Sequence, residues 1–268
     1  DEPPSVIKWQ LTKTSVNAEM IFNTNNSKST SEKLKIDKDG DSQFTGNVTI
    51  QDKTEIVSHS DLVGWWKLDG NLNDSSGNAN NGTFNGGTPV YVHNYENVAG
   101  KALNFDGTDD YISISNPLTS LTGNLTLSMW IKRDDTSQSG KTLISKYFAR
   151  EFDLTLWDRL VFYNGTTSSG VNYYYYDGPD TNTFLANTWY HIVVTRSGSG
   201  TSWTVKFYIN GILNITDSTP VLDTGGLGNN TPQSSSLEIN IGARNNNGSP
   251  ANYFNGKISD VRIYNRAL

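Results

Sequence analysis

The amino-acid sequence predicts an all-β protein, a two-sheet antiparallel sandwich of the jelly-roll type preceded by a small β segment. Its 24 glycines and many Asn, Ser and Thr residues, without a long helical run of Ala, Leu, Glu or Lys, predict strands joined by turns. Aromatic residues make up 11% of the chain against 35% hydrophobic residues in all, so a few large side chains supply much of the burial. Short β-prone runs follow one another from Leu62 to the C-terminus, a density typical of sandwiches.

The expected strands of the sandwich follow from alternation of apolar and polar residues. Leu125, Leu127 and Met129 recur at every second position of one run, and an Asn-Gly pair at 210–211 predicts a hairpin turn after another. The expected strands are 63–68, 101–105, 110–114, 124–132, 142–147, 152–157, 159–163, 188–196, 202–209, 237–242 and 256–264.

The chain is expected to divide into a β segment at 1–58, which anchors or oligomerises the protein, and a sandwich domain at 59–268. Short β-prone runs at Val6–Leu11, Ala18–Phe22, Lys33–Ile36 and Ser42–Ile50 make up the first part. Its stretch from 34 to 50 resembles pieces of phage tail-fibre and other virion-surface proteins. A segment so small and polar buries too little surface to fold alone, so we expect it to pack on the next domain or in a homo-oligomer, such as a trimer.

Charge and composition exclude several classes of function. A net charge of -6 without a cluster of Lys and Arg argues against nucleic-acid binding. No apolar run approaches the roughly 20 residues of a membrane helix, so we expect no membrane insertion. The absence of cysteine excludes zinc–thiolate sites and thiol nucleophiles.

Three carboxylates lie near the two ends of the expected sandwich. Asp69 and Asp74 follow an aromatic strand at 63–68, and Asp260 lies in the closing strand. If these strands meet, the carboxylates converge, and with Asn78 or main-chain carbonyls they would offer the oxygen ligands of a structural Ca²⁺. The alternative is that Asp74 only satisfies a tight turn through side-chain to backbone bonds. A second acidic run, 106–110, is either a competing metal site or a hairpin.

Seven motifs follow one another between residues 62 and 268: WWKLDGNLNDSSGNANNG, KALNFDGTDDYISI, NLTLSMWIK, NTWYHIVVT, VKFYINGIL, LEINIG and FNGKISDVRIYNRAL. Together they resemble the laminin-G-like, concanavalin A-like jelly roll, and they occur in the family's order. The resemblance implies two curved antiparallel sheets, often one calcium ion at the acidic positions just named, and service as a glycan- or protein-binding module attached to enzymes, adhesins and virion parts.

The catalytic motif of hydrolases on this scaffold is incomplete. Retaining hydrolysis needs two carboxylates about 5 Å apart, which a Glu-x-Asp-x-x-Glu strand provides. Here the run begins Glu151-Phe152-Asp153, but Leu156 stands where the second Glu belongs. His191 alternates with apolar residues, which is typical of a hydrogen-bonded core residue, and no Ser lies in a Gly-x-Ser-x-Gly elbow. We therefore expect no enzyme.

Four successive tyrosines form the most conspicuous binding candidate. Sugar faces stack on aromatic rings while their hydroxyls need polar partners. Successive side chains of a strand alternate, so the four rings cannot all face the core. We expect a loop from 173 to 180 to contact glycans, or else its rings to cover the sheet or a neighbouring protomer. The residues are Tyr173, Tyr174, Tyr175, Tyr176, Asp177 and Asp180, with Tyr147, Trp157, Tyr253 and Phe254 as secondary candidates.

The sequence hypothesis is thus a non-catalytic binding or adhesion module on an extracellular or virion surface. Its partner would be a glycan or a surface protein, with calcium rigidifying the turn from 69 to 78. The first alternative is a purely structural, self-assembling virion or surface-layer protein. The second is a glycoside hydrolase.

Overall fold

A computed structural model describes residues 20–21, 34–36, 42–44, 61–115, 120–134, 140–148, 150–166, 173–180, 183–222 and 231–268. The chain divides into two units, Asp1–Val57 and Ser58–Leu268, and each is described by itself. In the first unit, β1 (Met20–Ile21), β2 (Leu34–Ile36) and β3 (Ser42–Phe44) pair antiparallel in that order. The expected strand Val6–Leu11 lies outside the described residues.

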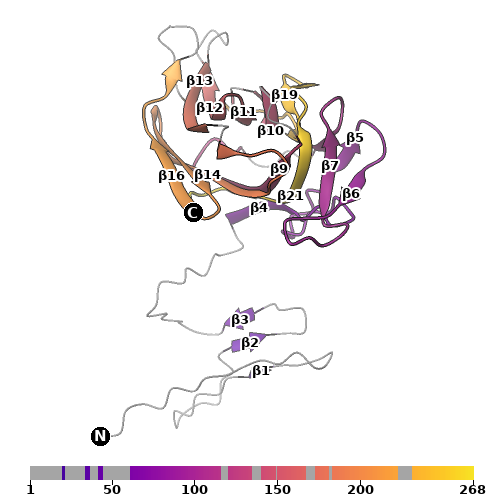
Figure 1. The fold of residues 1–268 in the computed structure, drawn as a ribbon. Helices are drawn as coiled ribbons and strands as arrows, with labels where there is room; N and C mark the ends of the chain where they lie inside the picture. Colours follow the sequence, from indigo (N-terminus) through magenta and orange to yellow (C-terminus); the bar gives the residue numbers. More distant parts are fainter. Residues whose placement is uncertain are drawn as a thin grey trace, which may run out of the picture. The chain divides into compact units, whose positions relative to one another are not determined.

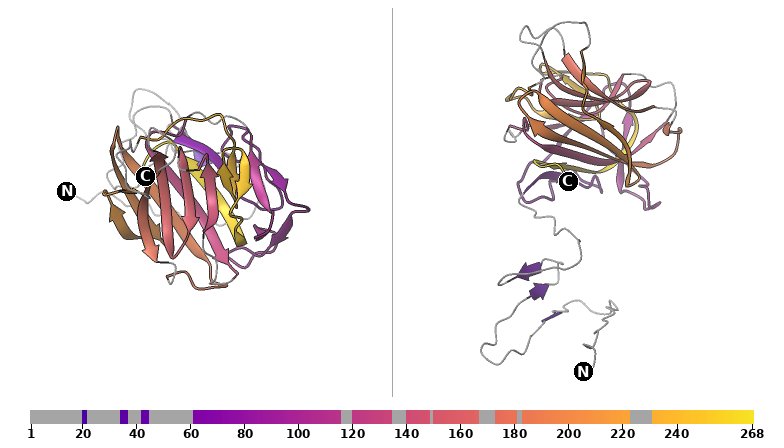
Figure 2. Two further views of the ribbon diagram at one scale, coloured as in Figure 1. Left: turned by 90° about the horizontal axis from the view of Figure 1, so that it is seen from above. Right: turned by 90° about the vertical axis from the view of Figure 1, so that its left-hand side faces the viewer.

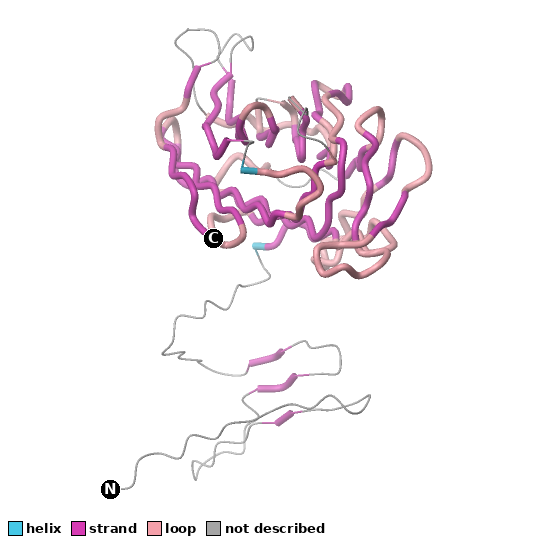
Figure 3. The backbone as a smooth tube through the Cα atoms, in the orientation of Figure 1, coloured by secondary structure: helices cyan, strands magenta, loops and turns pink. Residues whose placement is uncertain are grey.

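The second unit is a sandwich of two large antiparallel sheets, as the sequence predicts (Figures 1 and 2). Strands and loops make up almost all of its described backbone (Figure 3). The first sheet, called the β12 sheet, has the order β17 (Val221–Leu222), β13 (Tyr173–Asp180), β12 (Arg159–Thr166), β11 (Phe152–Leu156), β10 (Lys141–Lys146), β18 (Ile239–Ile241), β8 (Tyr111–Ile114), β5 (Thr83–Asn85).

The second sheet, called the β9 sheet, contains both the opening and the closing strand of the domain. Its order is β16 (Ile212–Asp217), β15 (Ser202–Ile209), β14 (Tyr190–Ser199), β9 (Leu125–Arg133), β21 (Asn255–Tyr264), β7 (Ala102–Asp106), β6 (Val90–Val92), and β4 (Leu62–Trp66) pairs with β21. A small hairpin of β19 (Arg244–Asn246) and β20 (Ser249–Ala251) lies outside the two sheets.

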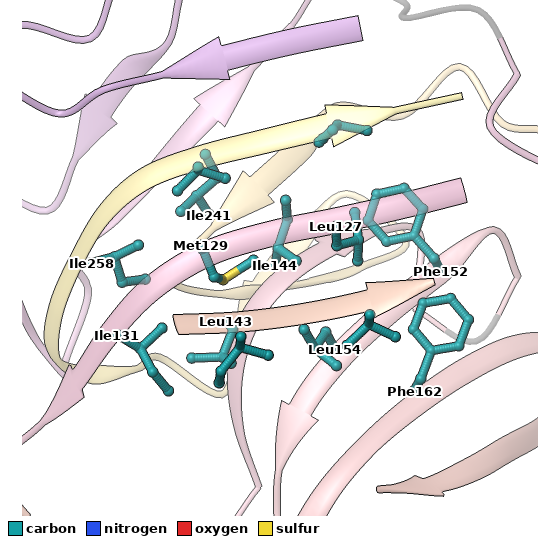
Figure 4. Close-up of a cluster of buried hydrophobic side chains, with 14 of the residues drawn as sticks. Leu127, Met129, Ile131, Leu143, Ile144, Phe152, Leu154, Phe162, Ile241 and Ile258 are labelled. Carbon is teal, nitrogen blue, oxygen red and sulfur yellow. The ribbon is translucent and has the colours of Figure 1, made fainter. Parts of the chain in front are cut away.

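The core lies between the two sheets and follows the alternation of their strands. In β9, Leu127, Met129 and Ile131 are buried and face apolar side chains of the β12 sheet, among them Leu154 and Phe162 (Figure 4). Because successive residues of a strand point to opposite faces, the residues between these point away from the core. These alternate residues therefore form the outer faces of the two sheets.

Arg196 is one of several charged side chains that are wholly buried in this unit. The Arg196 guanidinium is 0% exposed and donates hydrogen bonds to the main-chain oxygens of Leu121, Gly123 and Glu151 and to Oδ1 of Asn164. A planar group with five donors suits such a set of acceptors. Arg196 thus ties the segment before β9 to the β12 sheet.

The pairing of β4 with β21 confirms that the two ends of the domain meet. Trp66 lies opposite Val261 and Trp65 opposite Arg262, with a register shift between Ser259 and Arg262 on the β9 side of β21. Across the part of the chain that the structure describes, none of the helical turns is long and apolar enough to span a bilayer.

Candidate functional site

A cavity of about 300 Å³ opens on the outer face of the β12 sheet. We call it the aromatic cavity. It is lined from the β11–β12 turn, from β12 and from β13. Its lining residues are Trp157, Asp158, Arg159, Val161, Tyr163, Tyr175 and Asp177.

The alternation of β12 and β13 aims these side chains outward. In β12, Leu160 and Phe162 are buried in the core, so Arg159, Val161 and Tyr163 lie on the other face. The two strands pair with Val161 opposite Asp177 and with Tyr163 opposite Tyr175. The cavity floor is therefore a set of cross-strand neighbours held in register by the sheet.

The expected loop from 173 to 180 is a strand, β13, and this corrects the sequence interpretation. Tyr176 is 0% exposed and belongs to the core cluster, so its expected role in ligand binding is wrong. By alternation Tyr174 projects to the same side as Tyr176. Tyr175 and Asp177 point the other way and line the cavity. The pairing of β13 with β12 decides which tyrosines face the core.

The remaining expected ligand residues are distributed differently. Asp180 is exposed at the end of β13 and does not line the cavity. The side chain of Tyr173 lies outside the described residues. Among the secondary candidates, Trp157 lines the cavity whereas Phe254 is buried in the core.

Arg159 and Tyr163 line the cavity but were not among the binding residues expected from the sequence. Arg159, Val161 and Tyr163 occupy every second position of a predicted strand, and that spacing is a visible signal. What the sequence does not show is that this strand lies beside β13. The two halves of the site come from β12 and β13, and only the three-dimensional structure shows that these two strands pair.

The polar part of the aromatic cavity is one guanidinium between two carboxylates. Arg159 Nη2 lies 2.7 Å from Asp158 Oδ2, and its Nη1 lies 3.0 Å from Asp177 Oδ2. The hydrogen bond to Asp158, and then the charge of Asp177, raise the pKa of Arg159; the hydrogen bond from Arg159 lowers the pKa of Asp158. Asp177 Oδ1 is buried and has no hydrogen-bond partner among the described residues. The cavity therefore holds a cation fixed between two carboxylates, and beneath its surface lies one carboxylate oxygen without a protein partner among the described residues.

The aromatic part is held in place by packing. The Tyr163 and Tyr175 ring centroids lie 5.8 Å apart, and Phe148 meets Tyr163 edge-on at 5.0 Å. Burial, followed by the charge of Asp153, raises the pKa of Tyr163 to about 12, so its hydroxyl is neutral at ordinary pH. Trp157 lies at the rim with 37% of its surface exposed. One ring at the rim and two in the floor face the same space.

The two acids of the incomplete hydrolase motif form buried ion pairs. Glu151 and Asp153 are both 0% exposed. Glu151 pairs with Lys146 at 3.0 Å, and Asp153 pairs with Arg244 at 3.2 Å. Arg244 also stacks 3.6 Å from the Phe148 ring centroid. Both carboxylates are therefore committed to buried ion pairs beneath the surface of the sheet.

Asp74 organises the turn after β4. Its Oδ1 accepts hydrogen bonds from the main-chain nitrogens of Trp65 at 2.9 Å and Ser76 at 2.8 Å. Its Oδ2 accepts from Ser76 Oγ at 2.8 Å and from the main-chain nitrogen of Asn80 at 2.9 Å. Four donors converge on one carboxylate, which is the pattern of a side chain satisfying a tight turn.

The other expected metal ligands have separate partners. Asp260 contacts Trp65 and Arg262, Asp69 pairs with Lys101 at 3.1 Å, and the Asn78 amide nitrogen donates to the main-chain oxygen of Leu62 at 2.7 Å. Within the described residues, the one group of three acids with ligand atoms within 4.8 Å of one another is Asp106, Asp109 and Asp110. Asp69, Asp74 and Asp260 do not form such a group, so their expected convergence on one point is wrong, whereas calcium binding at the turn from 69 to 78 stays a prediction.

Comparisons with known proteins agree with this architecture. A family model described as the concanavalin A-like lectin/glucanases superfamily matches residues 106–268. The match does not extend to the N-terminal segment, whose likeness to virion-surface proteins stays a prediction. A search of curated proteins found no match.

Domain 4 of an arabinanase and the binding domain of a neurotoxin are two of the solved structures that share the fold. Domain 4 of AbnA, a GH43 extracellular arabinanase from Geobacillus stearothermophilus in complex with arabinotriose, has 24% identity and a TM-score of 0.55, covering 77% of this chain and 93% of that one. The binding domain of botulinum neurotoxin DC in complex with SialylT has 16% identity and a TM-score of 0.53, covering 79% of this chain and 49% of that one. At these levels of sequence identity, the similarity shows a shared fold only.

Proposed function

We propose that this chain, which belongs to the concanavalin A-like lectin/glucanase superfamily, is a non-catalytic module that binds glycans in the aromatic cavity. The observation on which the proposal rests is the cavity itself, which is lined by the exposed Trp157, by Tyr175 and by the Arg159–Asp177 ion pair. The two solved structures of the same fold are described in complex with arabinotriose and with SialylT, and this supports the proposal of glycan binding.

The chemistry of the cavity suits a neutral saccharide. Sugar C–H faces pack on aromatic rings, and Trp157 and Tyr175 offer such faces. Ring hydroxyls need partners when buried, and the Arg159 guanidinium and the partly exposed Asp177 carboxylate offer a donor and an acceptor. Two carboxylates surround one guanidinium, so the cavity has an excess negative charge that disfavours anionic sugars.

The absence of catalysis is also part of the proposal. The two acids of the incomplete hydrolase motif are buried in ion pairs, and Leu156, which replaces the third, is buried in the core. A module that binds glycans without cleaving them fits an extracellular or virion surface, where several copies would raise avidity.

A glycan array followed by calorimetry tests the proposal. We expect the full chain to retain neutral oligosaccharides, and Trp157→Ala or Tyr175→Ala to weaken binding at least about tenfold. Tyr208→Ala is the matched control, because this half-buried tyrosine lies on β15 in the other sheet. An array without any bound glycan, or cavity variants that bind like the parent, would contradict the proposal.

A self-assembling structural protein is the second candidate. Its support is β16, an edge strand of the β9 sheet on which Ile212 is 72% exposed and Leu213 is 48% exposed. Edge strands with exposed apolar side chains pair readily with another chain, here a second copy. Light scattering should then show an oligomer of the parent and a smaller species for Ile212→Lys. An equal mass for both would remove this candidate.

A further inference from the structure

A second cavity, of about 270 Å³, lies where the ends of the domain meet. We call it the seam cavity. It is lined by Trp65 of β4, by Lys67 and Asp69 just after β4, by the loop from 94 to 101, and by the bulge of β21 from 259 to 262. Trp66 and Val261 are buried in the core, so their neighbours Trp65 and Arg262 point away from it. The seam cavity is therefore on the outer face of the β9 sheet, whereas the aromatic cavity is on the outer face of the β12 sheet.

Tyr95 provides a rigid aromatic surface in the seam cavity. Its ring stacks on Trp130 with centroids 3.9 Å apart and 8° between planes, and Trp130 in turn stacks on His191 at 5.1 Å. The loop that holds Tyr95 is ordered by Asn94, whose Oδ1 accepts from the main-chain nitrogens of Glu96 at 3.0 Å and Val98 at 2.9 Å. Because Trp130 covers one face of Tyr95, the remainder of the ring borders the cavity.

The bulge of β21 fixes the charged side of the cavity. Asp260 has a φ of 52°, an uncommon conformation for a residue other than glycine, and it lies at the register shift. Bulges re-aim side chains, and such strained positions gather at functional sites. Here the Asp260 carboxylate accepts hydrogen bonds from Trp65 Nε1 at 2.6 Å and from Nε and Nη2 of Arg262, each at 3.0 Å.

The lining of the seam cavity has three basic and three acidic residues, and one of the basic residues forms no ion pair among the described residues. Asp260 is paired with Arg262, and Asp69 is paired with Lys101. Lys67 Nζ lies 4.5 Å from the Trp65 ring centroid and forms no ion pair with the residues that the structure describes. Arg262 Cζ lies at the same distance from that ring. Glu96, the third acid of the lining, is exposed. An ammonium and a guanidinium thus lie beside one indole next to a fixed tyrosine.

We propose that the seam cavity is a second saccharide site, independent of the aromatic cavity, which takes a saccharide that has a carboxylate. The sugar ring packs against Tyr95, and the carboxylate binds the Lys67 ammonium beside Arg262. The aromatic cavity, with its excess of carboxylate, takes the neutral saccharides. Because the two cavities lie on outer faces of different sheets, one chain would connect two separate glycan strands.

Calorimetry on the full chain tests this proposal with three carboxylated probes: trigalacturonate, a hyaluronan tetrasaccharide and sialyllactose. Each is paired with its methyl ester, which keeps the rings and removes the charge. We expect at least one acid to bind at least about tenfold more tightly than its ester, and the difference to shrink as salt rises. Lys67→Met should abolish the preference, whereas Glu96→Gln should strengthen it.

Two controls separate this site from the aromatic cavity and from general charge effects. Lys206→Met removes the same charge elsewhere on the β9 sheet, and Trp157→Ala disables the aromatic cavity; both should leave the acid's affinity unchanged. Lys67 is exposed, so its substitution leaves the fold intact. Binding of no acid, equal binding of acids and esters, or loss of acid binding in Trp157→Ala would each overturn the proposal.

Discussion

The Asp260 carboxylate accepts a hydrogen bond of 2.6 Å from the indole nitrogen of Trp65, although 195 positions separate the two residues in the chain. Trp65 belongs to the first strand of the sandwich and Asp260 to the last, and the strands themselves are paired. The main-chain nitrogen of Asp260 also donates to the main-chain oxygen of Lys67 at 3.2 Å. Side chains as well as main-chain bonds therefore close the domain.

Removing the charge of Asp260 should destabilise this closure. Asparagine tolerates a positive φ, so Asp260→Asn keeps the backbone but weakens the bonds to Trp65 and Arg262. We expect the free energy of unfolding to fall by about 1–3 kcal/mol. Trp65→Phe removes only the N–H donor and should cost less. In urea unfolding, the double variant should lose less than the two single losses combined, and strict additivity would contradict a direct coupling.

A substitution of Asp74 tests whether the stability of the turn after β4 depends on a metal. Its two oxygens accept four protein donors, so Asp74→Asn, which replaces one acceptor by a donor, should lower the free energy of unfolding by about 1–3 kcal/mol. Because those donors already satisfy the carboxylate, we expect the same loss in calcium and in chelator. A calcium-dependent rise in Tm of the parent that disappears in Asp74→Asn would instead support the calcium site predicted at 69–78.

His191 should make stability depend on pH. Burial, the largest effect, lowers the pKa of His191 below 6.5, against the smaller opposing effect of Asp260. The unfolded chain then binds more protons just below pH 6.5, so the free energy of unfolding is highest above pH 6.5 and falls as the pH drops through the folded pKa. His191→Gln can still contact Ser128 but does not titrate, so its profile should be flatter. Parallel denaturant profiles for parent and variant would contradict this assignment.

Arg196 should be among the most sensitive positions of the core. Replacing it by Met leaves the main-chain oxygens of Leu121, Gly123 and Glu151 without their buried donor. We expect a loss of about 3–5 kcal/mol in the free energy of unfolding, and Arg196→Lys should restore only part of it because an ammonium lacks the planar fork. Chemical denaturation measures both, and a loss below about 1 kcal/mol would refute the role of Arg196.

Strands with a clear two-residue period were predictable because that period is a local property of the chain. The expected strand 124–132 corresponds to β9 (Leu125–Arg133), and 202–209 coincides with β15. Strand β16 was missed, because its exposed edge position leaves no apolar alternation to detect. Strand β13 was absent from the expected strands and its segment was named a loop, although the alternation expected of its four tyrosines already implies an extended chain.

The candidate site was predictable only in part. Alternation alone predicts that some of the tyrosines from 173 to 176 leave the core, but the choice between Tyr175 and Tyr176 depends on register, which one residue of slip would reverse. The carboxylates at 69, 74 and 260 were rightly placed near the seam. Their individual partners, Lys101, the turn amides and Trp65, follow from packing that no local pattern shows.

By itself, the sequence determined that the chain is all β and that its sandwich begins near Leu62, because alternation and turn residues act over a few neighbours. The tertiary structure decided which aromatic rings and charges share a cavity. Trp157, Arg159 and Tyr175 face one space only because β12 pairs with β13, and Tyr95 joins Lys67 and Arg262 only because β4 pairs with β21. Pairing between strands that are far apart in the chain brings these side chains into one cavity, and no local sequence pattern predicts that.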